Sequence, residues 1–427
     1  MRIYLDTIGC RLNQSEIEAI GGQFRAGGHE LVPAAGDADL AVINTCAVTT
    51  DAASESRKLI RRVQREGAGE VIATGCWATL NPTEAAALPG VHRVVPNSQK
   101  EFLVPDLLGI PQEIFDLEPV ARQPLPGTRL RTRAFIKVQD GCDNRCTFCI
   151  TTIARGAGHS RPEAAIFADI HAALSGGAQE IVLTGVHLGS WGQDFAPGQH
   201  LSHLVAGILR ETDVPRLRLS SLEPWDLDED FFSLWAANPR LCPHLHLPLQ
   251  SGCDATLRRM ARKTTQASFR RLAAAARAAR PNIALTTDLI AGFPGETESE
   301  FAATSEFVAG MAFADAHIFT YSERPGTAAA TMPHPVPHPA RRERHARLRA
   351  IVDESAARYR QRFIGATLDV LWESARELGP DGWKMGGMAE NGLRVHATAP
   401  RDLWKEITSV RVSADVNGLL MGVISDE

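Results

Sequence analysis

Short apolar segments alternate with helix-length segments through roughly the first 120 residues, and this alternation constrains the fold more than any other feature. Strand-like runs cover 3–10, 40–46 and 70–76, and each ends in a cysteine. Strands that alternate with helices predict a parallel sheet, and the carboxyl ends of parallel strands lie at one edge of it. The cysteines predicted to meet at this edge are Cys10, Cys46 and Cys76.

Two helices are predicted between these strands, over 15–28 and 54–67, because their apolar residues recur with helical spacing. Serine favours the N-cap of a helix, and glycine favours the position where a helix ends. The predicted caps are Ser15 and Ser54 at the helix starts and Gly27 and Gly67 at the helix ends.

The alternation resumes after a proline-rich segment, 118–133, which is typical of a linker. Six βα units in roughly 200 residues are too few for a closed eight-fold barrel of about 250 residues, so a partial, open (β/α)6 barrel is predicted. The six strand candidates are 134–139, 180–185, 216–221, 244–249, 283–290 and 315–320.

The end of the chain changes character, because short apolar pieces separated by glycine and proline predict a small antiparallel β domain. These pieces are 368–373, 393–397, 407–416 and 419–424. The predicted fold class is α/β, with a parallel-sheet domain, a partial barrel and a β domain. The predicted domains are 1–122, 128–362 with a Pro/Arg-rich extension, and 363–427.

The composition bears on the cellular compartment of the protein and on the role of its cysteines. The chain is 44% hydrophobic and 22% charged, with a net charge of −5. No run approaches the 18 or so apolar residues of a membrane span, so a cytoplasmic protein without a membrane partner is predicted. Eight cysteines in 427 residues are too few for a disulfide scaffold, and they are better interpreted as ligands, nucleophiles or core thiols.

Three of these cysteines, Cys142, Cys146 and Cys149, form a C-x3-C-x2-C cluster just after a predicted strand. Three thiolates in one loop can hold three irons of a cubane cluster and leave the fourth iron open. A structural zinc site needs a fourth ligand, and His159 lies ten residues beyond the last cysteine. A zinc loop or a redox dithiol remains the alternative at this point.

The segments around this loop resemble the radical S-adenosylmethionine methylthiotransferase family, and most closely its bacterial branch that acts on threonylcarbamoyladenosine in tRNA. The resemblance extends from about residue 3 to residue 330. The matching segments are TIGCRLNQSE, INTCAVT, TGCWA, KVQDGCDNRCTFCITTIARG, TGVHLGSWG, RLSSLEP, HLHLPLQSGCDATLRRM, TTDLIAGFPGETESEF and YSERPGT.

The resemblance implies two [4Fe-4S] clusters. The first would bind S-adenosylmethionine, the source of the radical and the methyl group, and its ligands would be Cys142, Cys146 and Cys149. The second would carry or relay sulfur, and its ligands would be Cys10, Cys46 and Cys76. Cys242 and Cys253 have no partner spacing and are interpreted as structural.

Contacts to S-adenosylmethionine are expected at the carboxyl ends of the barrel strands. The resemblance adds an aromatic beside the adenine, Phe148, while the turn containing Gly292 also fits a helix start capped at Glu296 or Thr297. The candidate residues are Phe148, Thr184, Gly185, Ser221, Glu223, Gln250 and Gly292.

The expected reaction converts C2–H of N6-threonylcarbamoyladenosine at tRNA position 37 to C2–SCH3. A reductant such as flavodoxin or ferredoxin and a sulfur source are expected partners. Alternative substrates are isopentenyladenosine in tRNA or an aspartate of a ribosomal protein. A non-catalytic, metal-containing RNA-binding protein is the alternative from another class.

Binding of RNA requires local positive charge in this acidic chain. Basic runs at 57–65, 256–280 and 341–362 could provide it, although such runs are often only solvated helix faces. The segment 367–427 has six basic and ten acidic residues, so the predicted RNA contact rests on the arginine-rich segments of the central domain. Two positions depart from the family that the chain resembles: an arginine is missing between Arg155 and Arg161, and Ser15 stands where the family has tyrosine, and either change is expected to alter how the substrate is held.

Overall fold

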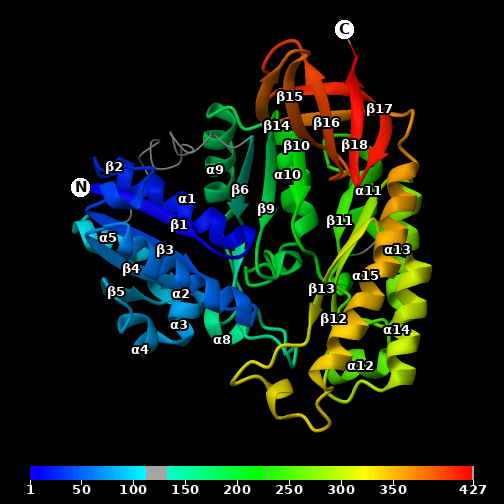
Figure 1. Ribbon diagram of the computed structural model, residues 1–427, viewed down its shortest axis with the longest axis horizontal. Coiled ribbons are helices and arrows are strands. Elements are labelled where there is room, and N and C mark those ends of the chain that lie inside the picture. The colour runs from blue at the N-terminus through cyan, green and yellow to red at the C-terminus, as the bar shows by residue number, and fades with distance from the viewer. Residues whose placement is uncertain (112–131, 228, 426–427) are drawn as a thin grey trace.

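A computed structural model describes residues 1–111, 132–227 and 229–425 (Figure 1). The first part is a five-stranded parallel sheet in the order β2-β1-β3-β4-β5. Its strands are β1 (Arg2–Thr7), β2 (Glu30–Leu31), β3 (Leu40–Thr45), β4 (Glu70–Gly75) and β5 (Val91–Val95). Its helices are α1 (Arg11–Ala26), α2 (Thr50–Arg65), α3 (Cys76–Leu80), α4 (Pro82–Ala86) and α5 (Leu103–Leu108).

Both predicted N-caps in this sheet domain are wrong. Helix α1 begins directly after Cys10, so Ser15 lies buried inside it. Helix α2 begins after Thr49, whose side chain accepts a hydrogen bond from the amide of Ala52. Each helix starts about a turn earlier than its apolar periodicity indicates, because a first turn does not need an apolar face, and only α2 has a side-chain cap there. Gly27 ends α1 as predicted.

The central part contains the six predicted strands as two three-stranded parallel sheets, β10-β9-β6 and β11-β12-β13. Parallel bridges Leu217↔Leu241 and Ser221↔His246 join them into one open, curved wall. The strands are β6 (Arg133–Lys137), β9 (Glu180–Thr184), β10 (Arg216–Leu219), β11 (His244–His246), β12 (Ala284–Ala291) and β13 (Asp315–Thr320). A short hairpin pairs β7 (Gln139–Asp140) with β8 (His159–Ser160).

Helices cover the convex side of this wall (Figure 1). They bury one large apolar core against alternate residues of the strands, including Leu285, Leu289 and Ile318. The helices of this part are α8 (Thr151–Arg155), α9 (Glu163–Ser175), α10 (Leu201–Glu211), α11 (Glu229–Ala237), α12 (Asp254–Arg259), α13 (Gln266–Ala279), α14 (Glu298–Met311) and α15 (His338–Gln361). A partial (β/α)6 barrel is therefore confirmed.

The last part is a closed five-stranded barrel in the order β14-β15-β16-β18-β17. Neighbouring strands are antiparallel except β16 and β18, which run parallel. The strands are β14 (Thr367–Gly379), β15 (Gly382–Ala389), β16 (Arg394–Ala399), β17 (Ile407–Val416) and β18 (Leu419–Ile424). The sequence missed β15, because its paired glycines, Gly386 and Gly387, have the appearance of a loop.

Gly387 is required by close packing inside this small barrel. A Cβ at this position would lie 2.5 Å from Cγ1 of Val370 and 2.9 Å from the Trp372 ring. We expect Gly387→Ala to destabilise the protein by about 1 to 3 kcal/mol through overpacking. Gly310 in α14 has open space around its Cα, so Gly310→Ala is expected to stabilise by about 1 kcal/mol. Urea unfolding of both variants measures this contrast, and equal effects would contradict it.

The three parts pack around the central strands. The barrel of β14–β18 covers the amino ends of β6 and β10, where Arg133 pairs with Glu373 at 2.6 Å and Arg216 donates to the carbonyl oxygen of Asp369 at 2.7 Å. Helix α1 of the first sheet packs beside β6. Most of the predicted linker and the first domain boundary fall within 112–131, outside the described residues. Among the described helices, none has both the length and the apolar character to span a bilayer.

Candidate active site

The first thiol cluster lies in the loop between β7 and α8, at the carboxyl edge of the central strands. Its members are Cys142, Cys146 and Cys149, all partly exposed. The backbone amide of Asn144 donates to Sγ of Cys142 at 3.4 Å, and Nη1 of Arg262 donates to Sγ of Cys146 at 3.7 Å. Hydrogen bonds of this kind stabilise thiolates and tune the potential of an iron–sulfur centre.

Two cations lie beside these sulfurs. Burial by itself would lower the pKa of His187, but hydrogen bonds to Asp226 and Cys142 raise it to about 10. The bond between Nε2 of His187 and Oδ2 of Asp226 is 2.7 Å long. Burial raises the pKa of Cys146, and Arg262 opposes this effect. The loop is therefore surrounded by groups that favour an anionic ligand set.

The second thiol cluster forms where the parallel sheet predicts it. Cys10 is the N-cap of α1, Cys46 follows β3, and Cys76 begins α3. Gly9 allows the close approach, since a Cβ on it would lie 2.9 Å from Sγ of Cys46. Nδ2 of Asn97 donates to Sγ of Cys76 at 3.6 Å. The sheet places the three thiols at one edge, because β3 pairs with both β1 and β4 and Thr45 lies opposite Gly75, one residue before Cys46 and Cys76.

Burial raises the pKa of Cys10, and it raises that of Cys46 to about 11. Such thiols are unreactive unless a metal displaces their protons. Cys242 is different, because burial raises its pKa to about 12 and neither thiol cluster is beside it. It packs in the core next to Glu180, in agreement with a structural role.

The chemistry of the donor sets suits an iron–sulfur cluster. Each set consists of three thiols, and within the described part of the chain neither set forms a compact metal-ligand group. A structural zinc site needs four ligands. Three thiolates can hold three irons of a cubane and leave the fourth open, so both donor sets fit a [4Fe-4S] group.

A buried polar network joins the two thiol clusters. Arg155, at the end of α8, contacts Glu16 of α1 at 2.8 Å, Asp140 at 2.9 Å and Asn13 at 2.8 Å. Lys100 contacts the other oxygen of Glu16 at 2.6 Å. The pKa of Glu16 lies well below its usual value, because Lys100 and Arg155 outweigh the opposing effect of burial.

This network gives Arg155 a structural role within the protein. All its partners are protein groups, and its side chain is 2% exposed. Sequence reasoning also missed Asn13, Glu16 and Lys100. The only signal was the placement of Asn13 and Glu16 on the first turns after Cys10, next to apolar positions that point into the fold.

The residues predicted to contact S-adenosylmethionine lie at the carboxyl ends of the strands, but two of them already have protein partners. Glu223 accepts hydrogen bonds from Arg262, at 3.0 Å for the longer one. The Gly292 amide donates to Oε2 of Glu296 at 2.9 Å, so it is not available to a ligand. Thr297 caps α14 with a capping box, as the helix-start interpretation predicts.

The other residues predicted to contact S-adenosylmethionine are less constrained by protein partners. Thr184 is buried at the end of β9, and Gly185 follows it against the side chain of Gln139. Ser221 bridges to β11, and Gln250 adopts a left-handed conformation with φ of 74°. Phe148 packs edge-on against Phe293, with ring centroids 6.5 Å apart.

Some basic residues of segments 256–280 and 341–362 are engaged within the protein, whereas others, including Arg258, Arg270 and Arg342, are exposed, so the RNA-binding role of these segments stays a prediction. Arg262 and Arg344 are buried in ion pairs, the latter with Glu296 at 2.8 Å. Charge reversal of Arg262 or Arg344 would therefore disturb folding. Arginines that donate instead to backbone carbonyls are Arg277, Arg280, Arg341, Arg349 and Arg362.

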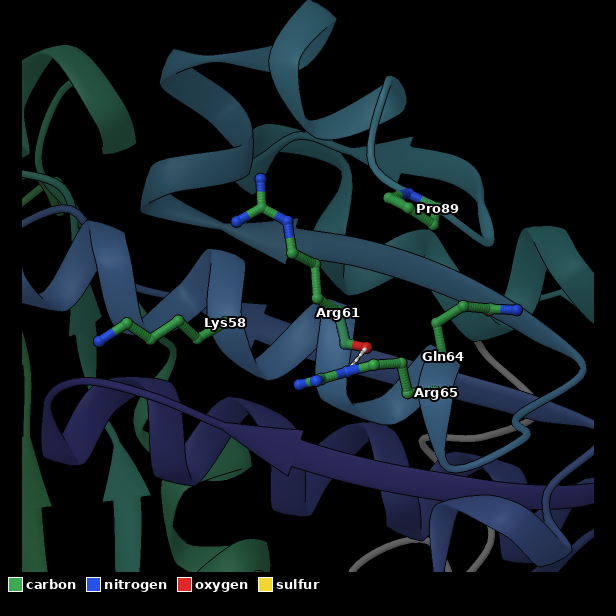
Figure 2. Close-up of a pocket in the computed structure, with 5 residues that line it drawn as sticks. All are labelled: Lys58, Arg61, Gln64, Arg65 and Pro89. Carbon is green, nitrogen blue, oxygen red and sulfur yellow. Dashed lines mark hydrogen bonds between the residues drawn. The ribbon is translucent and has the colours of Figure 1, made fainter.

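The basic run on α2 is more accessible. A hollow of about 350 Å³ lies beside this helix, and Figure 2 shows the side chains that line it. Its lining residues are Lys58, Arg61, Gln64, Arg65 and Pro89. None of them is a cysteine or a strand-end residue, so the hollow is separate from the thiol clusters.

Comparisons with known proteins agree with this architecture. Residues 2–96 match the family described as "Uncharacterized protein family UPF0004", and residues 136–308 match the Radical SAM superfamily. A structure of the radical S-adenosylmethionine methyltransferase TsrM from Kitasatospora setae covers 77% of this chain and 75% of its own. Its TM-score is 0.58 at 16% identity, so this likeness shows the fold.

Curated relatives are more similar in sequence. The "Threonylcarbamoyladenosine tRNA methylthiotransferase MtaB" of Thermotoga maritima is 38% identical over 87% of this chain and 86% of its own. The protein of the same name from Bacillus subtilis is 34% identical over 95% and 92%. A "tRNA-2-methylthio-N(6)-dimethylallyladenosine synthase" from Cereibacter sphaeroides is 33% identical over 99% and 98%.

A partial barrel with a three-cysteine loop at the end of its first strand defines a radical S-adenosylmethionine enzyme, whose class uses a [4Fe-4S] cluster and S-adenosylmethionine. The preceding parallel sheet has its own thiol cluster, which restricts the assignment to one family within the radical S-adenosylmethionine enzymes. The chain belongs to the radical S-adenosylmethionine methylthiotransferase family and is a transferase.

Proposed function

We propose that this enzyme converts C2–H of N6-threonylcarbamoyladenosine at position 37 of tRNA to C2–SCH3. The proposal rests mainly on one observation: a buried network around Arg155 joins the two thiol clusters. Each would hold a [4Fe-4S] cluster, with Cys142, Cys146 and Cys149 as one ligand set and Cys10, Cys46 and Cys76 as the other. The relatives named for threonylcarbamoyladenosine support this substrate.

A [4Fe-4S] cluster held by Cys142, Cys146 and Cys149 would supply the electron for reductive cleavage of S-adenosylmethionine. The protein positions the participants. His187 and Arg262 provide positive charge beside the loop sulfurs. The cofactor site is formed at the strand ends by Thr184, Gly185, Ser221 and Gln250, together with Phe148 of the cysteine loop. Glu223 acts through Arg262. The predicted division into 1–122, 128–362 and 363–427 assigns sulfur delivery to the first domain and radical formation to the second.

We test this function by anaerobic turnover with three substrates: tRNA carrying threonylcarbamoyladenosine, tRNA carrying isopentenyladenosine, and the ribosomal protein. A flavodoxin or ferredoxin serves as reductant, a sulfide salt as sulfur source, and nucleoside mass spectrometry reads the product. Methylthiolation of threonylcarbamoyladenosine alone is expected of this cytoplasmic enzyme. Preferential modification of either other substrate would overturn the assignment.

The outer face of α2 provides a surface for the tRNA backbone. Lys58, Arg61 and Arg65 are exposed around the hollow in Figure 2. Because each phosphate contact contributes about 0.9 to the slope of log affinity against log salt, reversing all three to glutamate should flatten this slope by about 2 to 3. Filter binding at several salt concentrations measures it. The matched control reverses Arg210, Arg358 and Arg401, and equal effects of the two triple variants would refute this surface.

A further inference from the structure

Two histidines and an aspartate come together on three neighbouring strands of the central wall, outside both thiol clusters. His246 ends β11, Asp288 lies in β12, and His317 lies in β13. Nε2 of His246 is 3.3 Å from Oδ1 of Asp288, and Nδ1 of His317 is 3.1 Å from the same oxygen. One ligand atom from each of the three side chains lies within 4.8 Å of the other two.

The three side chains share the inner face of the wall, which the helices leave uncovered (Figure 1). The residues next to them along the strands, Leu245, Leu289 and Ile318, pack in the core against the helices. Successive residues of a strand point to opposite faces, so the two histidines and the aspartate lie on the inner face. The predicted cofactor residues Ser221 and Gln250 are close by, because they form bridges to β11 and β12.

The spacing of the ligand atoms suits a single metal ion. A tetrahedral zinc ion, with bonds of about 2.0 to 2.1 Å to nitrogen and oxygen, holds its ligand atoms roughly 3.3 Å apart. The two contacts of Asp288, at 3.3 and 3.1 Å, already have this separation. The side chain of His317 is 70% exposed, so its ring can shift toward His246 without disturbing the core.

The surroundings of these side chains also suit metal ligands. Nδ1 of His246 is 2.9 Å from Oγ1 of Thr286, and a hydrogen bond at the second ring nitrogen is typical of a histidine that binds a metal. Burial by itself would raise the pKa of Asp288, but hydrogen bonds from His246 and His317 hold it well below its usual value. The carboxylate is therefore ionised at neutral pH, as a metal ligand must be.

We propose that His246, Asp288 and His317 bind a divalent metal ion of the zinc type. Imidazole and carboxylate groups are ligands that zinc accepts readily. Three protein ligands leave one position of a tetrahedral ion open, as in catalytic zinc sites. The strands occupy one side of the ion, so the open position faces the inside of the barrel, where it can accept water or an oxygen atom of a bound substrate. This site is separate from the two thiol clusters, and it does not depend on which RNA the enzyme modifies.

The test uses the reconstituted holoenzyme, in which iron occupies the thiols, because free cysteines also bind zinc. The protein is dialysed against buffered Zn²⁺ at micromolar free concentration, and bound zinc is measured by elemental mass spectrometry. We expect about one zinc ion per chain in the wild type. X-ray absorption at the zinc edge should show nitrogen and oxygen neighbours at about 2.0 to 2.1 Å and no sulfur at about 2.3 Å.

Variants assign the zinc to its ligands. Asp288→Asn and His317→Ala each remove a ligand and should weaken zinc binding by about a hundredfold or more. Thr286→Val removes the hydrogen bond behind one histidine and should weaken it about 10- to 100-fold. The control is His203→Ala on α10, which removes an exposed histidine whose ring lies 5.8 Å from that of His200 and should leave zinc binding unchanged.

Iron content and Tm show that each variant is folded and that its clusters are loaded. A wild type without bound zinc would show that the three side chains form only a hydrogen-bonded cluster, and it would overturn the proposal. Zinc bound through sulfur, or equal zinc in the wild type and in His317→Ala, would overturn it as well. Loss of zinc in His203→Ala with full retention in Asp288→Asn would place the ion on a surface pair of histidines instead. Methylthiolation of tRNA is measured separately, so failure of the zinc site leaves the proposed function intact.

Discussion

Replacement of Cys10, Cys46 and Cys76 by alanine is expected to remove about half of the iron, from about eight to about four atoms per chain after anaerobic reconstitution. Release of 5′-deoxyadenosine should continue, because the loop cysteines are unchanged. Methylthiolation should fall below detection, since the sulfur-carrying site is lost. Iron and sulfide analysis, together with chromatography of the cleaved cofactor, measures these effects.

Two comparisons make this result specific. Replacement of Cys142, Cys146 and Cys149 should also halve the iron but abolish cofactor cleavage. The control variant Cys242→Ala should keep all the iron, because this thiol is buried beside Glu180, away from both clusters. About four irons in the wild type, unchanged by the loss of Cys10, Cys46 and Cys76, would disprove a second cluster.

Arg155→Met is expected to cost about 3 to 5 kcal/mol of stability, because it leaves buried carboxylates without their partner. These carboxylates are Glu16 and Asp140, 2.8 and 2.9 Å from the guanidinium. Denaturant unfolding measures the loss. The exposed pair of Arg358 with Glu354 offers a matched control, and Arg358→Met should change stability by about 0.5 kcal/mol or less.

Arg155 is also a positioning residue, since its contacts fix α1 relative to the cysteine loop. In the folded fraction of Arg155→Met, cofactor cleavage should become uncoupled from methylthiolation, so that more 5′-deoxyadenosine is released per product. A variant with wild-type stability and coupling would show that the network has neither role.

The ion pairs of Glu16 are also expected to make the folded protein less stable at acid pH. Burial opposes ionisation of Glu16, but Lys100 and Arg155 hold its pKa well below the ordinary value of about 4.3. The contribution of ionised Glu16 to the free energy of unfolding is therefore complete above its unfolded-state pKa. It is lost as the pH falls through the lower folded-state pKa.

The sequence predicted those features that depend on local pattern. Six strand periods predicted the partial barrel, and strand ends predicted that Cys10, Cys46 and Cys76 would meet. The local sequence pattern did not predict features that depend on packing between segments. Strand β15 was missed because Gly386 and Gly387 are selected by close contact with β14 and not by strand propensity.

Long-range ion pairs were equally invisible in the sequence. Arg262 and Arg344 belong to basic runs in the sequence, but their acidic partners lie about 40 and 50 residues away and become neighbours only when the central domain folds.

The most direct measurement follows the hydrogen at C2 of the substrate. A stem-loop that carries threonylcarbamoyladenosine with deuterium at C2 is turned over anaerobically, and the 5′-deoxyadenosine is analysed by mass spectrometry. The account predicts that deuterium appears in 5′-deoxyadenosine and is absent from the methylthiolated nucleoside. Cofactor cleavage without deuterium transfer, together with unmodified RNA, would contradict it.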